Sequence, residues 1–226
     1  MSVRLALAGS SAQTAVCGPG CYRATLSAAS ARDTLSVDVR GGQASTRWSI
    51  ELPATWPSPD ASTLMARATA VWLSLRTLTF IDRLSSGPGQ EVTTHWQMVA
   101  PYKIAYQASH LGRNESDAVI IGNQRWDKLA GGKWTKSVQD PRLKQPVPFW
   151  VSVSDAHLLG EGTFAGRPVW YVSFFDPGTP AWFSVDLDKA TLRTLDLRMI
   201  TTEHFMHDTY ESFDTAVNIE SPDGQR

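Results

Sequence analysis

The residues best suited to chemistry gather near the end of the chain, in the run His204-Phe205-Met206-His207-Asp208. Imidazole and thioether groups are ligands that copper accepts, and Met199 could join His204 and Met206 in such a set. On a strand, however, successive side chains point to opposite faces, which would separate His204 from His207. We therefore expect one core face and one solvated face here, with copper binding as the alternative.

Two cysteines, Cys17 and Cys21, enclose the turn sequence Gly-Pro-Gly. Such a pair can close a small disulfide, bind a soft metal as thiolates, or remain free. No neighbouring histidine completes a metal-ligand set, so we expect the disulfide, which is typical of proteins outside the cytoplasm. Residues 1–8 carry one arginine and an apolar segment too short for a signal peptide, so we expect a piece of a longer exported protein.

The motifs of the common enzyme classes do not occur in the sequence. A nucleophile elbow, an H-E-x-x-H zinc motif, a P-loop and a dinucleotide-binding glycine run are all missing. Asp186 and Asp188 flank a predicted turn, and paired carboxylates can serve glycoside hydrolysis or calcium binding. Asp-x-Asp-Lys is more typical of a simple turn, and Lys189 would oppose a cation. We predict a protein that is not an enzyme and has no metal or cofactor.

Apolar and aromatic residues on predicted strands give the strongest functional signal, and the chain has 9 tryptophans. On a curved sheet one face of these strands would line a concavity that a single helix covers only in part. The alternative is a fully packed core. Arg83, Arg125 and Arg198 are the candidates for meeting a polar headgroup. The predicted ligand-binding residues are Trp96, Met98, Ile104, Tyr106, Trp126, Trp170, Phe174, Trp182, Leu197 and Met199.

The composition of the 226 residues is that of a globular protein, with 42% hydrophobic and 19% charged residues. The net charge is −1, from 21 basic and 22 acidic residues. This balance gives no electrostatic support for a nucleic-acid partner. No apolar run reaches the roughly 18 residues that a transmembrane helix needs.

Residues 1–56 read as a small β module, with strands expected at 3–8, 22–27, 34–39 and 46–52. A helix is predicted from residue 58 to 75, because Ser58 fits the N-cap and Pro59 the first helical position. Its apolar stripe would pack on a sheet. The stripe consists of Leu64, Met65, Ala68, Val71, Trp72 and Leu75.

The rest of the chain, to residue 217, predicts about ten antiparallel strands in simple up-and-down order. A polar, proline-rich loop at 138–149 interrupts them, and long loops of this kind are often functional. Residues 218–226 form a polar tail that we expect to fray.

Four sequence features over residues 58–215 resemble one known family. They are Phe80-Ile81-Asp82-Arg83-Leu84, Pro101-Tyr102-Lys103-Ile104-Ala105-Tyr106, the hairpin at 119–126 and the aromatic strands at 182–195. Together with the element order they are similar to the lipoprotein-carrier superfamily, which includes LolA, LolB and the mycobacterial lipoproteins LppX and LprG. The resemblance implies an unclosed β-barrel that binds acyl chains on its concave face. Residues 1–56 look similar to the end of an immunoglobulin-like module of envelope metal-handling proteins.

These observations predict an α+β protein: a highly curved antiparallel sheet with a helix on its concave face, preceded by a small β module. The expected units are residues 1–56, 57–217 and the tail 218–226. The expected function is extracytoplasmic, non-enzymatic binding of an apolar ligand, such as a lipid or a lipoprotein acyl chain. Membrane association would come from a longer native chain. The alternative is a copper-responsive envelope sensor or scaffold.

Overall fold

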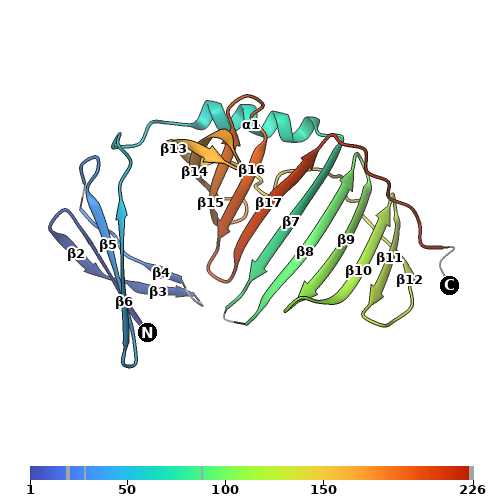
Figure 1. Ribbon diagram of the computed structural model, residues 1–226, viewed down its shortest axis with the longest axis horizontal. Helices are drawn as coiled ribbons and strands as arrows, with labels where there is room; N and C mark the ends of the chain where they lie inside the picture. The colour runs from blue at the N-terminus through green and yellow to red at the C-terminus, as the bar shows by residue number, and fades with distance from the viewer. Residues whose placement is uncertain (19–20, 28, 88, 224–226) are drawn as a thin grey trace.

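The computed structural model describes residues 1–18, 21–27, 29–87 and 89–223, without the side chains of residues 17, 18 and 21. The N-terminal residues form two small sheets beside the large one (Figure 1). The four-stranded sheet has the order β2-β1-β5-β6, and β3 pairs with β4. The strands are β1 (Ser2–Leu7), β2 (Ser10–Gln13), β3 (Ala15–Gly18), β4 (Cys21–Arg23), β5 (Thr34–Gly41) and β6 (Ala44–Glu51). The strand expected at 22–27 therefore ends at Arg23, because residues 24–27 have no ladder partner.

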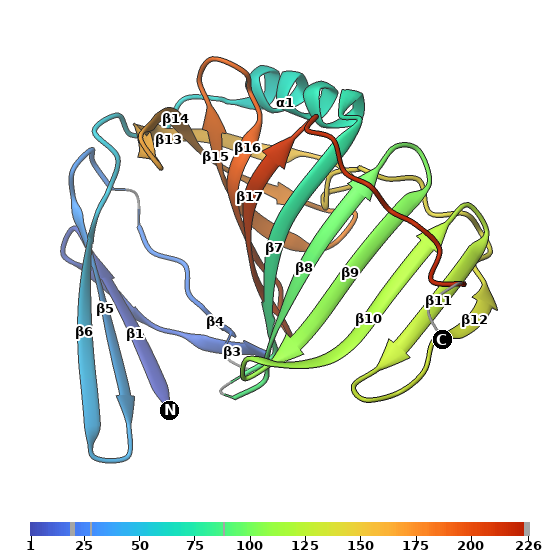
Figure 2. The same cartoon turned by 45° about the vertical axis from the view of Figure 1, so that its right-hand side comes forward.

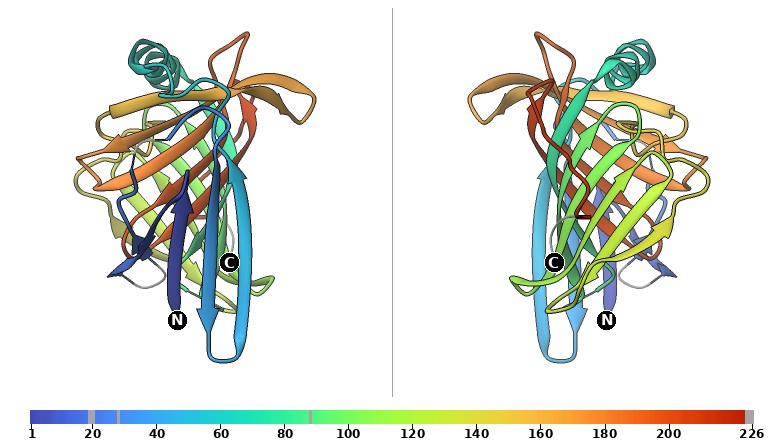
Figure 3. Two further views of the ribbon diagram at one scale, coloured as in Figure 1. Left: turned by 90° about the vertical axis from the view of Figure 1, so that its left-hand side faces the viewer. Right: turned by 90° about the vertical axis from the view of Figure 1, so that its right-hand side faces the viewer.

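Helix α1 (Ser62–Ser74) is shorter than predicted, and it begins at Ser62 instead of following Ser58. Residues 59–61 lie outside the helix because they pair with the first strand after the long loop. The amide of Ala61 donates to the carbonyl of Ala156 at 2.9 Å, and the carbonyl of Pro59 accepts from Leu158. The predicted stripe is confirmed: Met65, Ala68 and Trp72 are buried. Figure 1 shows α1 lying along one end of the large sheet, and the side views show the helix nearly end-on there (Figure 3).

An 11-stranded antiparallel sheet, curved but not closed, forms the main body (Figure 2). Its order is β12-β11-β10-β9-β8-β7-β17-β16-β15-β14-β13. The first half consists of β7 (Thr77–Ser85), β8 (Glu91–Val99), β9 (Lys103–His110), β10 (Arg113–Ile121), β11 (Gln124–Leu129) and β12 (Thr135–Val138). The second half consists of β13 (Ser154–Phe164), β14 (Arg167–Asp176), β15 (Ala181–Asp188), β16 (Thr194–Ile200) and β17 (Phe205–Phe213). The predicted curved, unclosed sheet with a helix is confirmed.

The expected single up-and-down order is wrong at one place. Two meanders, β7 to β12 and β13 to β17, meet where β17 pairs with β7. Residues 139–153, here called the crossing segment, connect one outer edge of the sheet to the other. Local sequence patterns reveal strands and turns, but they do not reveal which distant strands pair. The long proline-rich loop is what makes this crossing possible.

The crossing segment is fixed between the helix and the sheet. Trp150 packs edge-on against Trp72 of α1, at 6.0 Å, and against Phe174 of β14, at 5.4 Å between ring centroids. Its indole N–H donates to Thr69 at 3.0 Å. The indole N–H of Trp72 donates to Thr194 at 2.9 Å, so both buried tryptophans keep their polar atoms paired.

Asp176, fully buried at the end of β14, anchors the last residues of the crossing segment. Its carboxylate accepts from the amides of Val151 and Ser152, at 2.8 and 3.0 Å, and from Gly178 and Thr179 in its own turn. Burial alone would raise the pKa of Asp176, but these hydrogen bonds outweigh it and lower the pKa to about 2.

The expectation of a fraying tail is wrong up to residue 223. Ile219 is buried, and the carboxylate of Asp223 accepts from the indole N–H of Trp126 at 2.7 Å. The C-terminal segment crosses the outer strands on their convex side (Figures 1 and 2). The tail is thus held on the sheet by the buried Ile219 and by the bond between Asp223 and Trp126.

Candidate ligand-binding cavity

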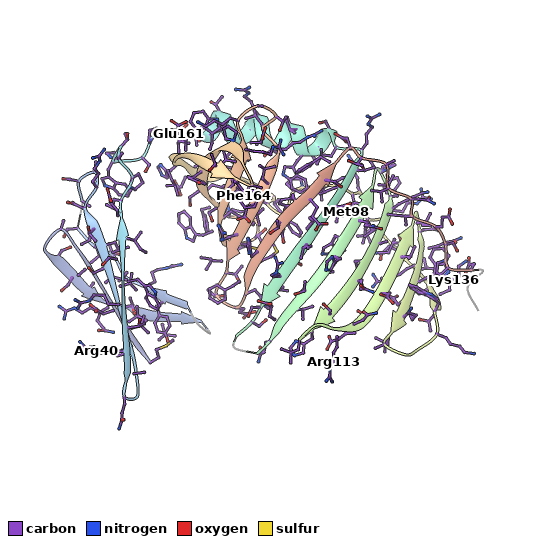
Figure 4. All side chains as sticks on the ribbon, in the orientation of Figure 1. Arg40, Met98, Arg113, Lys136, Glu161 and Phe164 are labelled. Atoms are coloured by element: carbon purple, nitrogen blue, oxygen red, sulfur yellow. The ribbon has the colours of Figure 1, made fainter. Side chains whose placement is uncertain are left out.

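A cavity of about 260 Å³ lies between the concave side of the first meander and the crossing segment. Its lining is almost wholly apolar. Figure 4 labels Met98, which lies on β8 in this wall. The lining residues are Trp72 from α1, then Phe80, Trp96, Met98, Ile104, Tyr106, Ile120 and Arg125 from the sheet, and Leu143, Gln145, Val147, Pro148 and Phe149 from the crossing segment.

Aromatic rings form the central wall of the cavity. Phe80 stacks on Trp96, with ring centroids 6.0 Å apart and planes within 9°. Trp96 also contacts Tyr106 on the next strand at 4.6 Å, and Phe149 meets Phe80 edge-on at 5.9 Å. Strand alternation brings these residues to one face, and the crossing segment closes the space over them. The space can therefore exclude water from an apolar ligand.

One cationic side chain, Arg125, lies in the lining. Its guanidinium donates to the carboxylate of Asp127, at 2.7 to 3.0 Å, and to the hydroxyl of Tyr106 at 3.0 Å. The bond to Asp127 raises the pKa of Arg125 further above its ordinary value. Arg125 is therefore held in a fixed position at the wall, with its charge partly compensated.

A pair of acids is buried where the two meanders meet. Asp82 on β7 and Asp208 on β17 face each other across the ladder, and Asp208 is completely buried. Tyr210 donates to Asp208 at 2.9 Å, while Oδ1 of each aspartate has no partner among the described residues. Burial raises the pKa of Asp82 to about 6, and burial together with the charge of Asp82 raises the pKa of Asp208 to about 8. The pair therefore retains a proton at neutral pH.

Of the predicted ligand-binding residues, Trp96, Met98, Ile104 and Tyr106 line the cavity. Phe174 and Leu197 are fully buried in the core beneath α1 and the crossing segment. Trp170 lies under the ammonium group of Lys189, at 3.9 Å from the ring centroid. Met199 faces a second hollow, at the end of β16 and β17. Ligand contact by any of these residues remains a prediction.

Two of the predicted residues face the other side of the sheet. Trp182 is 45% exposed on the convex face, beside Phe175, because Ala181, Phe183 and Val185 occupy the concave face of β15. Trp126 is buried on the convex face, where its ring lies under Lys136 and its N–H bonds Asp223. Neither residue can reach the cavity from these positions.

Sequence reasoning missed the lining contributed by Trp72, Phe80 and Ile120 and by the crossing segment. The sequence indicates that the proline-rich loop is a functional candidate, but it does not assign Leu143, Val147 and Phe149 within the loop to the site. Their apolar character in an otherwise polar loop was the available signal, because exposed loops rarely carry several large apolar residues without a surface to cover.

The remaining candidate groups have structural partners. His204 Nδ1 lies 2.8 Å from the Ser86 hydroxyl, and His207 is 2.6 Å from Asp196 on the convex face. Met199 and Met206 are ladder partners. Within the described ranges, no group of three or more His, Cys, Asp or Glu residues is arranged to hold a metal. In the part of the chain that the structure describes, no observation favours the copper alternative.

Three smaller expectations have mixed outcomes. The predicted turn at Asp188 is confirmed, since its carboxylate accepts from the amides of Ala190 and Thr191. Arg83 and Arg198 line the hollow at the end of β16 and β17, away from the cavity. The predicted disulfide involves the side chains of Cys17 and Cys21, which lie outside the described residues.

No helix in the described part of the chain is long and apolar enough to cross a membrane.

Comparison with solved structures identifies the fold. Lipoprotein LppX of Mycobacterium tuberculosis has a TM-score of 0.55 and 11% identity, over 70% of this chain and 98% of LppX. LprF of Mycobacterium bovis has a TM-score of 0.54 and 11% identity, over 73% of this chain and 99% of LprF. No protein-family model and no curated protein sequence matches. The helix and the large sheet thus have the LppX-like fold that the sequence resemblance implied.

Proposed function

We propose that this protein binds an apolar ligand, one acyl chain of a lipid or lipoprotein, in the cavity under the crossing segment. It acts as a binding protein outside the cytoplasm and performs no reaction on its ligand. The proposal agrees with the fold it shares with LppX, a protein described as a lipoprotein.

The observation that carries the proposal is a preformed cavity with an aromatic and aliphatic lining. Its volume of about 260 Å³ is near the lower end of the roughly 300–1,000 Å³ typical of ligand pockets. A single chain is therefore a better fit than a whole lipid. Each methylene group transferred from water into such a lining contributes about 0.8 kcal/mol, so affinity should rise with chain length until the cavity is full.

Arg125 supplies the place for the ligand's polar end. It is the one cation among the lining residues, and its position is fixed by Asp127 and Tyr106. Because Asp127 already compensates part of its charge, we expect a headgroup to bind there weakly and the chain to provide most of the affinity.

Native mass spectrometry of protein purified from cells should show a co-purified lipid, and a fluorescent fatty-acid probe should bind the delipidated protein. Val147→Trp fills the cavity from the crossing segment, and we expect it to reduce probe affinity at least tenfold. Val138→Trp, at an exposed position on β12, is the matched control and should bind as the unmodified protein does. A ligand-free mass together with no probe binding would refute the proposal.

A further inference from the structure

Another hollow, here called the convex groove, lies on the face of the large sheet opposite the cavity. Its volume is about 460 Å³. His95 and Gln97 on β8 and Gln107 on β9 line it, and they alternate with the residues that line the cavity on the other face. Asp117 of β10 and Glu211 of β17 add two carboxylates. The groove thus opens on the other face of the sheet and has a mixed lining, in which these polar side chains lie beside Ala105, Val119 and Trp134. Trp96 and Tyr106 belong to the lining of both hollows.

The hollow exists because the floor of the groove contains a small residue. Thr79, Gln97, Ala105 and Val119 lie side by side on four neighbouring strands. The methyl group of Ala105 leaves a gap in this row. Trp134, from the loop between β11 and β12, supplies an aromatic wall. A long side chain at position 105 would fill the groove, as long side chains do on most solvated sheet faces.

One side of the groove is held in place by a chain of contacts. Asp117 accepts from the amide group of Gln107 at 3.0 Å and pairs with Lys128 at 3.0 Å. The ammonium group of Lys128 lies 5.1 Å from the ring centroid of Trp134. The bonds from Lys128 and Gln107 keep the pKa of Asp117 below its ordinary value, even though burial opposes this. The carboxylate, amide and ring are therefore prearranged.

The other side of the groove offers free polar groups. Within the described residues, the side chains of His95, Gln97 and Glu211 make no side-chain hydrogen bond or ion pair, yet all three line the groove. Together with the free carbonyl oxygen of the Gln107 amide, they present both donors and acceptors to a ligand.

We propose that the convex groove binds a neutral oligosaccharide. The apolar C–H face of a sugar ring can stack on Trp134, and its hydroxyl groups need the mixed donors and acceptors that Gln97, Gln107 and Glu211 provide. The volume lies within the roughly 300–1,000 Å³ typical of ligand pockets.

Other ligand classes fit this lining poorly. A phosphate or nucleotide would meet the carboxylates of Asp117 and Glu211, and the nearby cation, Lys128, is already paired. An acyl chain would leave amide and carboxylate groups buried without partners. A peptide that adds a strand needs the edge of a sheet, and the groove lies on a face.

The test is calorimetric titration with chitotetraose, maltotetraose and cellotetraose. At least one should bind with a stoichiometry of one, and Trp134→Ala and Gln97→Ala should each weaken that binding at least tenfold. Trp182→Ala removes an exposed tryptophan from the same face outside the groove, so its affinity should be unchanged. Circular dichroism shows whether each variant is folded. If the Trp134→Ala variant does not fold, the Gln97→Ala variant still tests the proposal.

Absence of binding by all three saccharides would overturn the proposal. So would a loss of saccharide affinity in the Trp182→Ala control equal to the loss in the folded Trp134→Ala or Gln97→Ala variant. The cavity variant Val147→Trp should keep full saccharide affinity, because it acts on the opposite face. The outcome for the groove is therefore independent of whether an acyl chain binds in the cavity.

Discussion

Replacing Asp208 by asparagine should remove a large part of the pH dependence of stability. The pKa values of Asp82 and Asp208 in the folded protein, about 6 and about 8, lie above the ordinary value of 3.8. The folded state therefore keeps protons that the unfolded chain has already lost. The stability from these protons is fully present below about pH 4 and is lost as pH rises through the two folded values. Asparagine preserves the shape of Asp208 and carries no titrating proton.

The magnitude follows from the proton count. Above pH 6 the unfolded chain has lost the proton of Asp208, whereas the folded protein still holds it until about pH 8. A difference of one bound proton changes the free energy of unfolding by about 1.4 kcal/mol per pH unit, so the decline from pH 6 to 8 reaches about 2.7 kcal/mol at most. Tyr210, which donates to Asp208, and Asp196 on the neighbouring strand are the other ionisable groups that act on it.

The assay is urea unfolding followed by tryptophan fluorescence at pH 6, 7 and 8. The Asp208→Asn variant should lose about 2 kcal/mol less than the unmodified protein across this range. Asp140→Asn changes an exposed aspartate in the crossing segment, far along the chain from the buried pair, and it should leave the slope unchanged. The reasoning is refuted if the unmodified protein and Asp208→Asn show the same slope.

Three further changes test other parts of the structure. Asp176→Ala should lower the free energy of unfolding by about 3 kcal/mol, because it leaves several buried donors unpaired. It should also speed hydrogen exchange at the Val151 amide, and unchanged exchange there would contradict the anchoring role. The contribution of Asp176 is present above its ordinary value of 3.8 and is lost as pH falls through about 2. Trp72→Phe should destabilise by about 1–3 kcal/mol, by leaving the buried Thr194 hydroxyl unpaired, and a double-mutant cycle with Thr194→Val should show coupling; additive losses would argue against that bond. Phe149→Ala should enlarge the cavity, lower stability by about 2–4 kcal/mol, and shift probe preference to longer chains, whereas an unchanged preference would place the chain elsewhere.

Much of the candidate site follows from local sequence periodicity. Alternation alone puts Trp96 and Met98 on one face of their strand, and the structure places both in the cavity wall. The same alternation predicts the position of Trp182, because Ser184 and Asp186 lie on the same face of the strand as Trp182 and indicate that this face is solvated.

The remaining features depend on contacts between distant segments. Helix signals at Ser58 and Pro59 are strong locally, but backbone pairing of residues 59–61 with β13 takes precedence over them. Burial of Trp126 requires the C-terminal segment, and the polar composition of that segment predicts that it does not pack on the sheet. The pairing of β17 with β7 has no local signature, and the proximity of Asp82 and Asp208 follows from that pairing alone.

The central position of the β7–β17 pair also determines how the protein must be made. During synthesis β7 to β12 emerge before β13 to β17. The side of β7 that pairs with β17 remains an open edge until residues 205–213 leave the ribosome. Pairing strands so far apart in sequence slows folding, and open apolar edges recruit other chains. A chain shortened before residue 205 should therefore aggregate. In the full chain, β7 to β12 must stay free of contact with other chains until β17 is available to pair with β7.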